Sequence, residues 1–315
     1  MNEKTIRKIE AIKQGTIGVE IEMNNISRKE AAKIAAEHFG TGRWEDTDYR
    51  NGYRTFSAWD QQDREWKFSY DSSIAGPESQ RCELITPILH YEDIELLQEL
   101  CRRLRKAGAK SDPTRGTAVH VHIGADGHTP QSLRTLINLM ASHEQLIIDA
   151  LQIDHGRVAR YCKTVDPRFL RELNSKKPRT MAKLADIWYT SQGEGYGRNN
   201  HYNGSRYTFC NLHATFTKGT IEFRGWNFLP PADGKQNGIH CGLLKTFIQL
   251  SLALSAHAKE IKCASAKPIQ TEKPKFAMRT WLNNLGLIGP EFETARKFLT
   301  QNLEGDTAFR FGRAA

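Results

Sequence analysis

Apolar and polar residues alternate in three segments of the chain. Residues 16–24 are TIGVEIEMN, residues 117–125 are TAVHVHIGA and residues 219–226 are GTIEFRGW. Successive side chains of a β-strand point to opposite faces, so this alternation gives a strand one apolar and one polar face. Each segment is therefore predicted to be a strand whose apolar face lies in a core.

Shorter alternating runs predict further strands. Residues 53–59 and 65–70 flank a polar turn and predict a β-hairpin, and residues 81–89 predict another strand. Residues 207–214 predict a strand that a turn at 217–219 joins to the third alternating segment.

Helical patterns lie between these strands. Ser27 and Gly40 bracket one helix as its caps, and residues 91–106 place an apolar residue every three or four positions. Further helices are predicted at 130–153, at 238–258 and as two short helices within 276–313, with loops at 191–207 and 262–275 and no clear pattern over 155–190. Locally paired strands with interspersed helices, and no regular strand–helix alternation, predict an α+β fold with an antiparallel sheet.

Composition agrees with an ordinary globular chain. The 315 residues are 39% hydrophobic, and the sequence contains neither a dinucleotide-binding GxGxxG motif nor a P-loop. No apolar run approaches the roughly 18 residues that span a bilayer, and the charged N-terminus lacks the apolar segment of a signal peptide. We therefore expect a cytoplasmic protein without a membrane partner. The six cysteines form no CxxC pair and are expected to be reduced.

The chain is basic, with 45 Lys and Arg against 36 Asp and Glu, a net charge of +9. Such a charge suits a nucleic acid, a nucleotide or a phosphate, although a solvated basic surface explains it equally well. Two cationic clusters stand out, Arg102, Arg103, Arg105 and Lys106 in one, and Arg157, Arg160, Lys163 and Arg168 in the other.

The polar faces of the three main strands carry pairs of functional side chains. These pairs are Glu20 and Glu22, His120 and His122, and Glu222 and Arg224, and Glu83 lies in a fourth segment. Like charges on one face repel and are costly to bury, which a cation between the strands would offset. Carboxylates with imidazole suit Mg²⁺ or Mn²⁺, and arginines such as Arg206 and Arg224 suit a polyphosphate.

Each pair alone has a simpler interpretation. Two glutamates at alternate positions are usually a solvated face, and a glutamate next to an arginine is usually a weak ion pair. The two histidines are also compatible with exposed side chains or with zinc ligands. Because four segments would each need a separate explanation, the set together favours a divalent metal site.

Several segments resemble the amidoligase family, which is related to glutamine synthetase and glutamate–cysteine ligase. They are GVEIEM at 18–23, DSSI at 71–74 with CELITPIL at 82–89, AVHVHIGA at 118–125, RYTFCNL at 206–212, TIEFRGW at 220–226 and the C-terminal residues 279–310. The resemblance implies a curved antiparallel sheet with flanking helices, like the catalytic domain of glutamine synthetase. We expect one catalytic domain over residues 1–265, with a helical tail over 266–315 packed on it.

The resemblance also implies an activity, the ATP-dependent joining of a carboxylate to an amine through an acyl phosphate, on small-molecule or peptide substrates. It assigns divalent ions to Glu20, Glu22, Glu83, His120 and Glu222, ATP phosphates to His122 and Arg206, and the transferring phosphoryl group to Arg224. Glu194 and Asp71 are candidates for the base that deprotonates the amine, and residues 191–205 form either a lid or an ordinary connection. Two alternatives stay open, a metal-dependent hydrolase and a nucleic-acid-associated protein, and the sequence does not indicate an oligomeric state.

Overall fold

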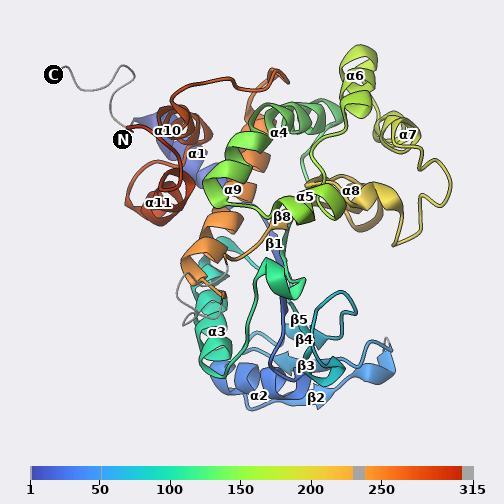
Figure 1. The fold of residues 1–315 in the computed structure, drawn as a ribbon, viewed down its shortest axis with the longest axis vertical. Helices are drawn as coiled ribbons and strands as arrows, with labels where there is room; N and C mark the ends of the chain where they lie inside the picture. Colours follow the sequence, from blue (N-terminus) through green and yellow to red (C-terminus); the bar gives the residue numbers. More distant parts are fainter. Residues whose placement is uncertain (1, 51, 230–237, 307–315) are drawn as a thin grey trace. The chain divides into compact units, whose positions relative to one another are not determined.

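The computed structural model describes residues 2–50, 52–229 and 238–306 and shows a mixture of helices and strands (Figure 1). The chain divides into two compact units. Unit 1 comprises residues 1–15, 122–225 and 246–315, and unit 2 comprises residues 16–121 and 226–245.

Unit 2 contains most of the open antiparallel sheet. Its strands are β1 (Ile17–Met23), β2 (Trp44–Asp46), β3 (Phe56–Trp59), β4 (Glu65–Ser69), β5 (Cys82–Ile85) and the first half of β6 (Val119–Gly124). They lie in the order β2-β3-β4-β5-β1-β6, and the four pairs from β2 to β1 are antiparallel.

The strand register gives this sheet one apolar and one polar face. Phe68 lies opposite Leu84, which lies opposite Ile21, so three apolar side chains form one row. Helices α2 (Arg28–Phe39) and α3 (Ile94–Lys106) belong to the same unit, and α2 packs against β3, β4 and α3. The Phe39 ring of α2 contacts the Trp66 ring of β4, with their centroids 4.9 Å apart. Burial of these side chains supplies the core of unit 2.

The second row of side chains in unit 2 is polar. Ser69 lies opposite Glu83, which lies opposite Glu22. The alternation in the sequence therefore places the glutamates of β1 and β5 on the face away from the apolar core.

Unit 1 is mainly helical. Its helices are α1 (Glu3–Lys13), α4 (Pro130–Leu151), α5 (His155–Arg160), α6 (Pro167–Lys176), α7 (Met181–Ser191), α8 (His213–Lys218), α10 (Pro274–Leu285), α11 (Glu293–Thr300) and most of α9 (Cys241–Glu260). Its strands are the second half of β6, then β8 (Thr220–Trp226) and β7 (Cys210–Asn211). Helix α11 packs against α10 and α4, which holds the C-terminal helices to this unit.

The predicted α+β class, the main strands and most of the predicted helices are confirmed. Ser27 caps α2 by accepting a hydrogen bond from the Glu30 N–H, and Gly40 ends it in the left-handed conformation with φ of 72°. The two helices predicted within 276–313 are α10 and α11, while residues 307–313 of that range lie outside the described residues. All six cysteines are free.

Of the two strands predicted around residue 217, the second is confirmed as β8 and pairs antiparallel with the first, but the length of the first strand and the turn after it are wrong. The first strand, β7, has two residues, and α8 follows it in place of a turn. The Asn211 Oδ1 atom accepts a hydrogen bond from the His213 N–H at 2.8 Å, which starts the helix, and Gly219 ends it with φ of 71°. The glycine that suggested a hairpin turn is the C-cap of a short helix.

Other features of the fold were not predicted. Helices α5, α6 and α7 fill the region over 155–190 that showed no clear pattern, and α1 and β2 had no recognised signal. The domain boundary at residue 265 and the likeness to glutamine synthetase stay predictions. Within the described part of the chain, no helix combines the length and the apolar character needed to cross a membrane.

Candidate functional site

Two glutamates face each other directly across β1 and β5 of unit 2. Glu22 and Glu83 are register partners, so their side chains leave neighbouring strands at the same level. Like charges in this arrangement are destabilising. Glu22 is also only 5% exposed, so water does little to reduce the repulsion.

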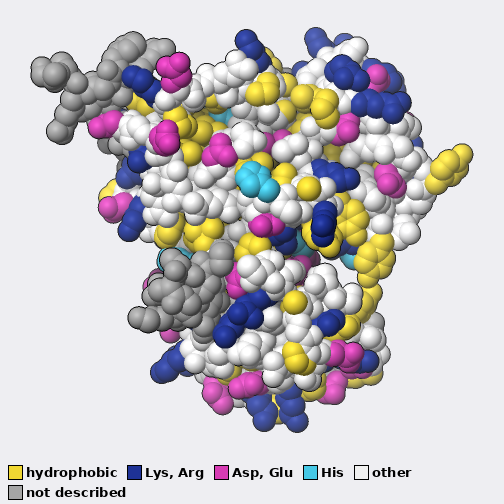
Figure 2. Space-filling view, in the orientation of Figure 1, with side chains coloured by type: hydrophobic (Ala, Val, Ile, Leu, Met, Phe, Trp, Pro, Cys, Tyr) yellow, Lys and Arg dark blue, Asp and Glu magenta, His cyan; other side chains and the backbone are white. Residues whose placement is uncertain are grey.

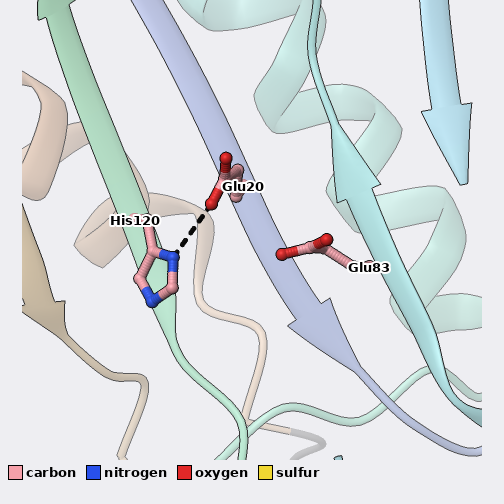
Figure 3. A group of neighbouring side chains, drawn as sticks. All are labelled: Glu20, Glu83 and His120. Atoms are coloured by element: carbon pink, nitrogen blue, oxygen red, sulfur yellow. Dashed lines mark hydrogen bonds and ion pairs between the residues drawn. The ribbon is translucent and has the colours of Figure 1, made fainter. Parts of the chain in front are cut away.

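A histidine on the next strand completes this group. The His120 Nδ1 atom lies 3.0 Å from Glu20 Oε2, and its Nε2 atom lies 3.8 Å from Glu22 Oε1. Figure 3 shows Glu20, Glu83 and His120 on three neighbouring strands, with the Glu83 carboxylate extending toward β1. The His120 side chain is buried, so its orientation is set by packing and by the glutamates.

These side chains offer ligand atoms to a metal ion. Glu20, Glu83 and His120 each contribute one donor atom, and the donors lie within 4.8 Å of one another. Glu22, Asp71 and Glu83 form a second group that meets the same criterion. Carboxylate oxygens with one imidazole nitrogen form a donor set that fits Mg²⁺ or Mn²⁺.

Asp71 was predicted as a candidate base, and the structure places it among the carboxylates. It follows β4, whose Ser69 pairs with Glu83, and its Oδ1 atom accepts a hydrogen bond from the Ser73 N–H at 2.6 Å. The DSSI segment that contributed to the family resemblance thus contains a potential ligand. The sequence indicated this ligand by placing the Asp71 carboxylate two residues after Ser69, the last residue of β4, whose side chain lies on the polar face.

A second group of polar side chains lies in unit 1. Glu222 accepts hydrogen bonds from Arg224 Nη1 at 3.1 Å and from Asn211 Nδ2 at 2.6 Å. The His122 Nε2 atom lies 4.0 Å from Glu222 Oε1, and its Nδ1 atom lies 2.9 Å from Thr220 Oγ1. His122, Glu222 and Arg224 are all buried. Asn211, whose role was not predicted, fixes one carboxylate oxygen of Glu222.

The Arg224 side chain is held on several sides. Its Nε donates to the Tyr161 carbonyl at 3.2 Å, and its guanidinium carbon lies 5.4 Å from the centre of the Tyr207 ring. The Arg157 Nη2 atom donates to the Arg224 carbonyl at 3.3 Å. Helix α5 and the residues after it therefore orient an arginine that points along the polar face of β8.

Arg206 lies near the same tyrosine and is more exposed. Its guanidinium carbon is 5.7 Å from the Tyr207 ring centre and 5.4 Å from that of Tyr202, and its Nη1 donates to the His201 carbonyl at 3.0 Å. Two guanidinium groups thus lie near the Tyr207 ring, which favours their positive charge.

The loop at 191–205 has an internal organisation. The Asn203 Nδ2 atom faces the carbonyls of Glu194, Tyr196 and Gly197 at 3.3 to 3.4 Å. The Glu194 carboxylate packs against Gly204, where a Cβ atom would lie 2.1 Å from Glu194 Oε1. Glu194 belongs to none of the metal-ligand groups found among the described residues. Its role as a base, and that of the loop as a lid, stay predictions.

The cysteines beside these groups are poor nucleophiles. Cys82 precedes Glu83 and Cys210 precedes Asn211, and both are fully buried. Burial raises the pKa of each thiol, and the charge of the nearby glutamates raises it further. These cysteines act as small apolar residues in the core.

Comparison with known proteins identifies one family. The model of the family described as "putative amidoligase enzyme" matches residues 13–229, which contain every residue of both groups. No curated protein matches the sequence. Among solved structures, the chain is similar to a bifunctional glutathione synthetase from Pasteurella multocida, with 13% identity and a TM-score of 0.45 over 96% of this chain and 49% of that one. The chain thus spans about half the length of that protein.

Proposed function

The chain belongs to the amidoligase family, and from this premise we propose that it is an ATP-dependent carboxylate–amine ligase. The observation that carries the proposal is the Glu22–Glu83 opposition with His120 alongside. Opposed carboxylates, one of them buried, suit the binding of divalent ions, which an enzyme that handles a metal–nucleotide complex requires.

In this proposal, divalent ions are held by Glu20, Glu22, Glu83 and His120 of unit 2 and by Glu222 of unit 1. Asp71 joins them because its carboxylate shares a group with Glu83. When bound, such ions neutralise phosphate charge and keep the attacking and leaving oxygens in line. The donor chemistry of these residues fits this task.

The arginines and His122 act on the phosphates in this proposal. Arg224 is oriented by Glu222 and by the Tyr161 carbonyl, so it meets developing charge on a phosphoryl group without first having to reorganise. Arg206 is partly exposed and suits the binding of incoming nucleotide. His122 is fixed through Thr220 and contacts a phosphate oxygen.

The reaction follows from the weakness of carboxylates as electrophiles. Transfer of the γ-phosphoryl group from ATP to the substrate carboxylate releases ADP and forms an acyl phosphate. A neutral amine then attacks the acyl carbon, the new C–N bond forms, and phosphate leaves with the former carboxylate oxygen. The proton lost by the amine passes to a base or to water.

The test is ADP release by the purified protein with Mg²⁺ or Mn²⁺ and a pool of amino acids, peptides and polyamines, followed by mass spectrometry of the products. We expect ADP and a product lighter by one water than its acid and amine together. Glu83→Gln and Glu222→Gln should abolish both, while Glu95→Gln, an exposed carboxylate on α3, should not.

Full turnover in the Glu83→Gln and Glu222→Gln proteins would contradict the proposed metal roles. Hydrolysis of peptides in the pool without ATP would instead favour the metal-dependent hydrolase. Arg224 beside Glu222 and Arg206 beside Tyr207 argue against that alternative, because a simple hydrolase does not require phosphate-binding groups.

A further inference from the structure

Most of the excess positive charge of the chain lies in one short segment. Residues 155–183 contain nine Lys and Arg and two Asp and Glu, a balance of +7, whereas the whole chain carries +9. The other 286 residues are therefore close to neutral. Charge spread for solubility alone would be distributed more evenly.

The fold of this segment turns the charges outward. The Phe169 ring of α6 meets the Trp188 ring of α7 edge to face, with their centroids 4.9 Å apart, and Leu173 and Leu184 are fully buried. The cationic side chains project from the other faces of the helices. The seven exposed ones that follow α5 form what we call the α6–α7 basic surface: Lys163, Arg168, Arg171, Lys176, Lys177, Arg179 and Lys183. Figure 2 shows dark blue Lys and Arg side chains gathered over α6.

Acidic side chains neutralise little of this surface. Glu172 pairs with Lys176 at 2.6 Å, and Asp186 pairs with Arg198 from the following loop at 2.5 Å. The other six members of the α6–α7 basic surface form no ion pair with the described part of the chain. Clustered cations without acidic partners, displayed on packed helices, are typical of a surface that binds a polyanion.

Exposed aromatic rings also lie in unit 1. Tyr161, two residues before Lys163, is 47% exposed, and its ring meets that of Tyr207 edge to face. Tyr202 is 60% exposed and lies beside the Arg206 guanidinium. A bridge between Lys163 and Thr208 ties the basic segment to the residues that follow these tyrosines. Aromatic faces next to guanidinium groups stack on nucleic-acid bases, which acidic peptides do not offer.

We propose that the α6–α7 basic surface, together with the exposed tyrosines Tyr161 and Tyr202 of the same unit, binds single-stranded nucleic acid. The cations contact the phosphate backbone and the tyrosine rings stack on unpaired bases. The Tyr161 carbonyl also accepts a hydrogen bond from Arg224, so a strand that stacks on Tyr161 runs near a residue of the proposed ligase. The proposal goes beyond ligase activity, and its test does not depend on turnover.

The test measures fluorescence anisotropy of labelled 20-nucleotide dT and U strands over a range of salt concentrations. The variant Arg168→Glu/Arg171→Glu/Lys183→Glu should bind at least about tenfold more weakly, and the slope of log K against log salt should fall by about 2, since each phosphate contact on a single strand contributes about 0.7. The matched control, Arg102→Glu/Arg103→Glu/Lys106→Glu on α3, makes the same change in net charge and should bind almost as tightly as the parent.

A second variant separates stacking from charge. Tyr202→Ala should weaken binding severalfold while leaving the salt slope unchanged, because it removes a ring and no charge. Equal losses in the two charge-reversal variants would overturn the proposal by showing an effect of net charge alone. Equally effective competition by polyglutamate would also overturn it, because the surface would then recognise any polyanion.

Discussion

At the scale of single residues, Glu144 on α4 is a buried acid outside the proposed chemistry. Its Oε2 atom accepts a hydrogen bond from the Val165 N–H at 2.9 Å, and its Oε1 atom has no hydrogen-bond partner among the described residues. Burial raises the pKa of Glu144 from its ordinary value of 4.5 to about 7. The folded protein therefore holds a proton that the unfolded chain releases between those pH values.

The sign of the resulting pH dependence follows from this difference. The folded state binds more protons than the unfolded state between pH 4.5 and 7, so the free energy of unfolding falls as pH rises through this window, by about 3 kcal/mol in all. Glu144→Gln removes the titration and should be more stable than the parent at pH 8, by about 1 to 2 kcal/mol once the buried amide's own cost is included.

Urea unfolding at pH 5 and pH 8 checks this prediction. The parent should lose stability between the two values by more than the variant does. Asp149→Asn, an exposed acid on the same helix, is the control and should follow the parent. A parent whose stability rises from pH 5 to pH 8 relative to Glu144→Gln would show that Glu144 is charged in the native protein.

Arg224 allows a prediction on function at the same scale. Its Nη1 donates a hydrogen bond to Glu222 and its Nε donates one to the Tyr161 carbonyl. The single ammonium group of lysine cannot make both bonds in this geometry. Arg224→Lys should keep the charge and the fold, and should lower kcat for ADP release by about 100-fold, the usual loss for one oriented donor. A change confined to the KM for ATP would instead assign Arg224 to ground-state binding.

At the scale of elements, strand β8 depends on a glycine beside Arg224. A Cβ atom at Gly225 would lie 2.2 Å from the Phe209 ring, which is fully buried. The Arg224 N–H donates to the Phe209 carbonyl at 2.9 Å, so the strand cannot move away without breaking this bond. Only a residue without a side chain fits here.

Gly225→Ala should therefore destabilise the protein by about 1 to 3 kcal/mol, the usual cost of overpacking. The same substitution should cost less in a Phe209→Leu background, where the ring is absent. Chemical unfolding of the four proteins of this cycle gives the coupling energy. Additive losses would show that the ring is not the cause.

The sequence predicted elements well where the hydrophobic period was long enough to follow. In β1, Val19 and Ile21 are buried as expected, and the glutamates that alternate with them, Glu20 and Glu22, lie on the polar face. Helices α5, α6 and α7 have 6, 10 and 11 residues, too short for an apolar repeat to extend over many turns. Their caps, Asp154, Asp166 and Thr180, were the local signals that the hydrophobic pattern did not contain.

The candidate site was predictable in its residue types and less so in its contacts. Alternation alone placed Glu20 and Glu22 on one face, but the direct opposition of Glu22 and Glu83 depends on strand register. Register is set by pairing between segments about 60 residues apart, which no local pattern specifies. Asn211 escaped prediction for a similar reason, because its contact with Glu222 requires β7 and β8 to pair.

At the scale of the whole molecule, the candidate residues divide between the two units. Glu20, Glu22, Asp71, Glu83 and His120 belong to unit 2, and His122, Arg206, Glu222 and Arg224 belong to unit 1. His120 and His122 occupy alternate positions of one strand, so β6 contributes a histidine to each group. The family model also matches both groups within one continuous range, 13–229.

Metal binding should be visible as a change in the stability of the whole protein. Any ion that binds only the folded state stabilises it, by about 2.7 kcal/mol at a concentration 100 times its Kd. Without metal, the opposed carboxylates of Glu22 and Glu83 destabilise the folded protein, because like charges directly opposite each other cost up to about 1 kcal/mol. One substitution should therefore have opposite effects in the two conditions.

Glu83→Gln is that substitution, because Glu83 belongs to both ligand groups of unit 2. In EDTA the variant should melt at the same temperature as the parent or slightly above it. In saturating Mn²⁺ the parent should gain several degrees and the variant much less, since the amide is a weaker ligand than the carboxylate. Calorimetry of both proteins with and without Mn²⁺, with Glu95→Gln as the exposed control, measures all four values. An equal Mn²⁺ shift in Glu83→Gln and the parent would place the metal elsewhere, whereas a large loss of stability in EDTA would show that Glu83 supports the fold rather than an ion.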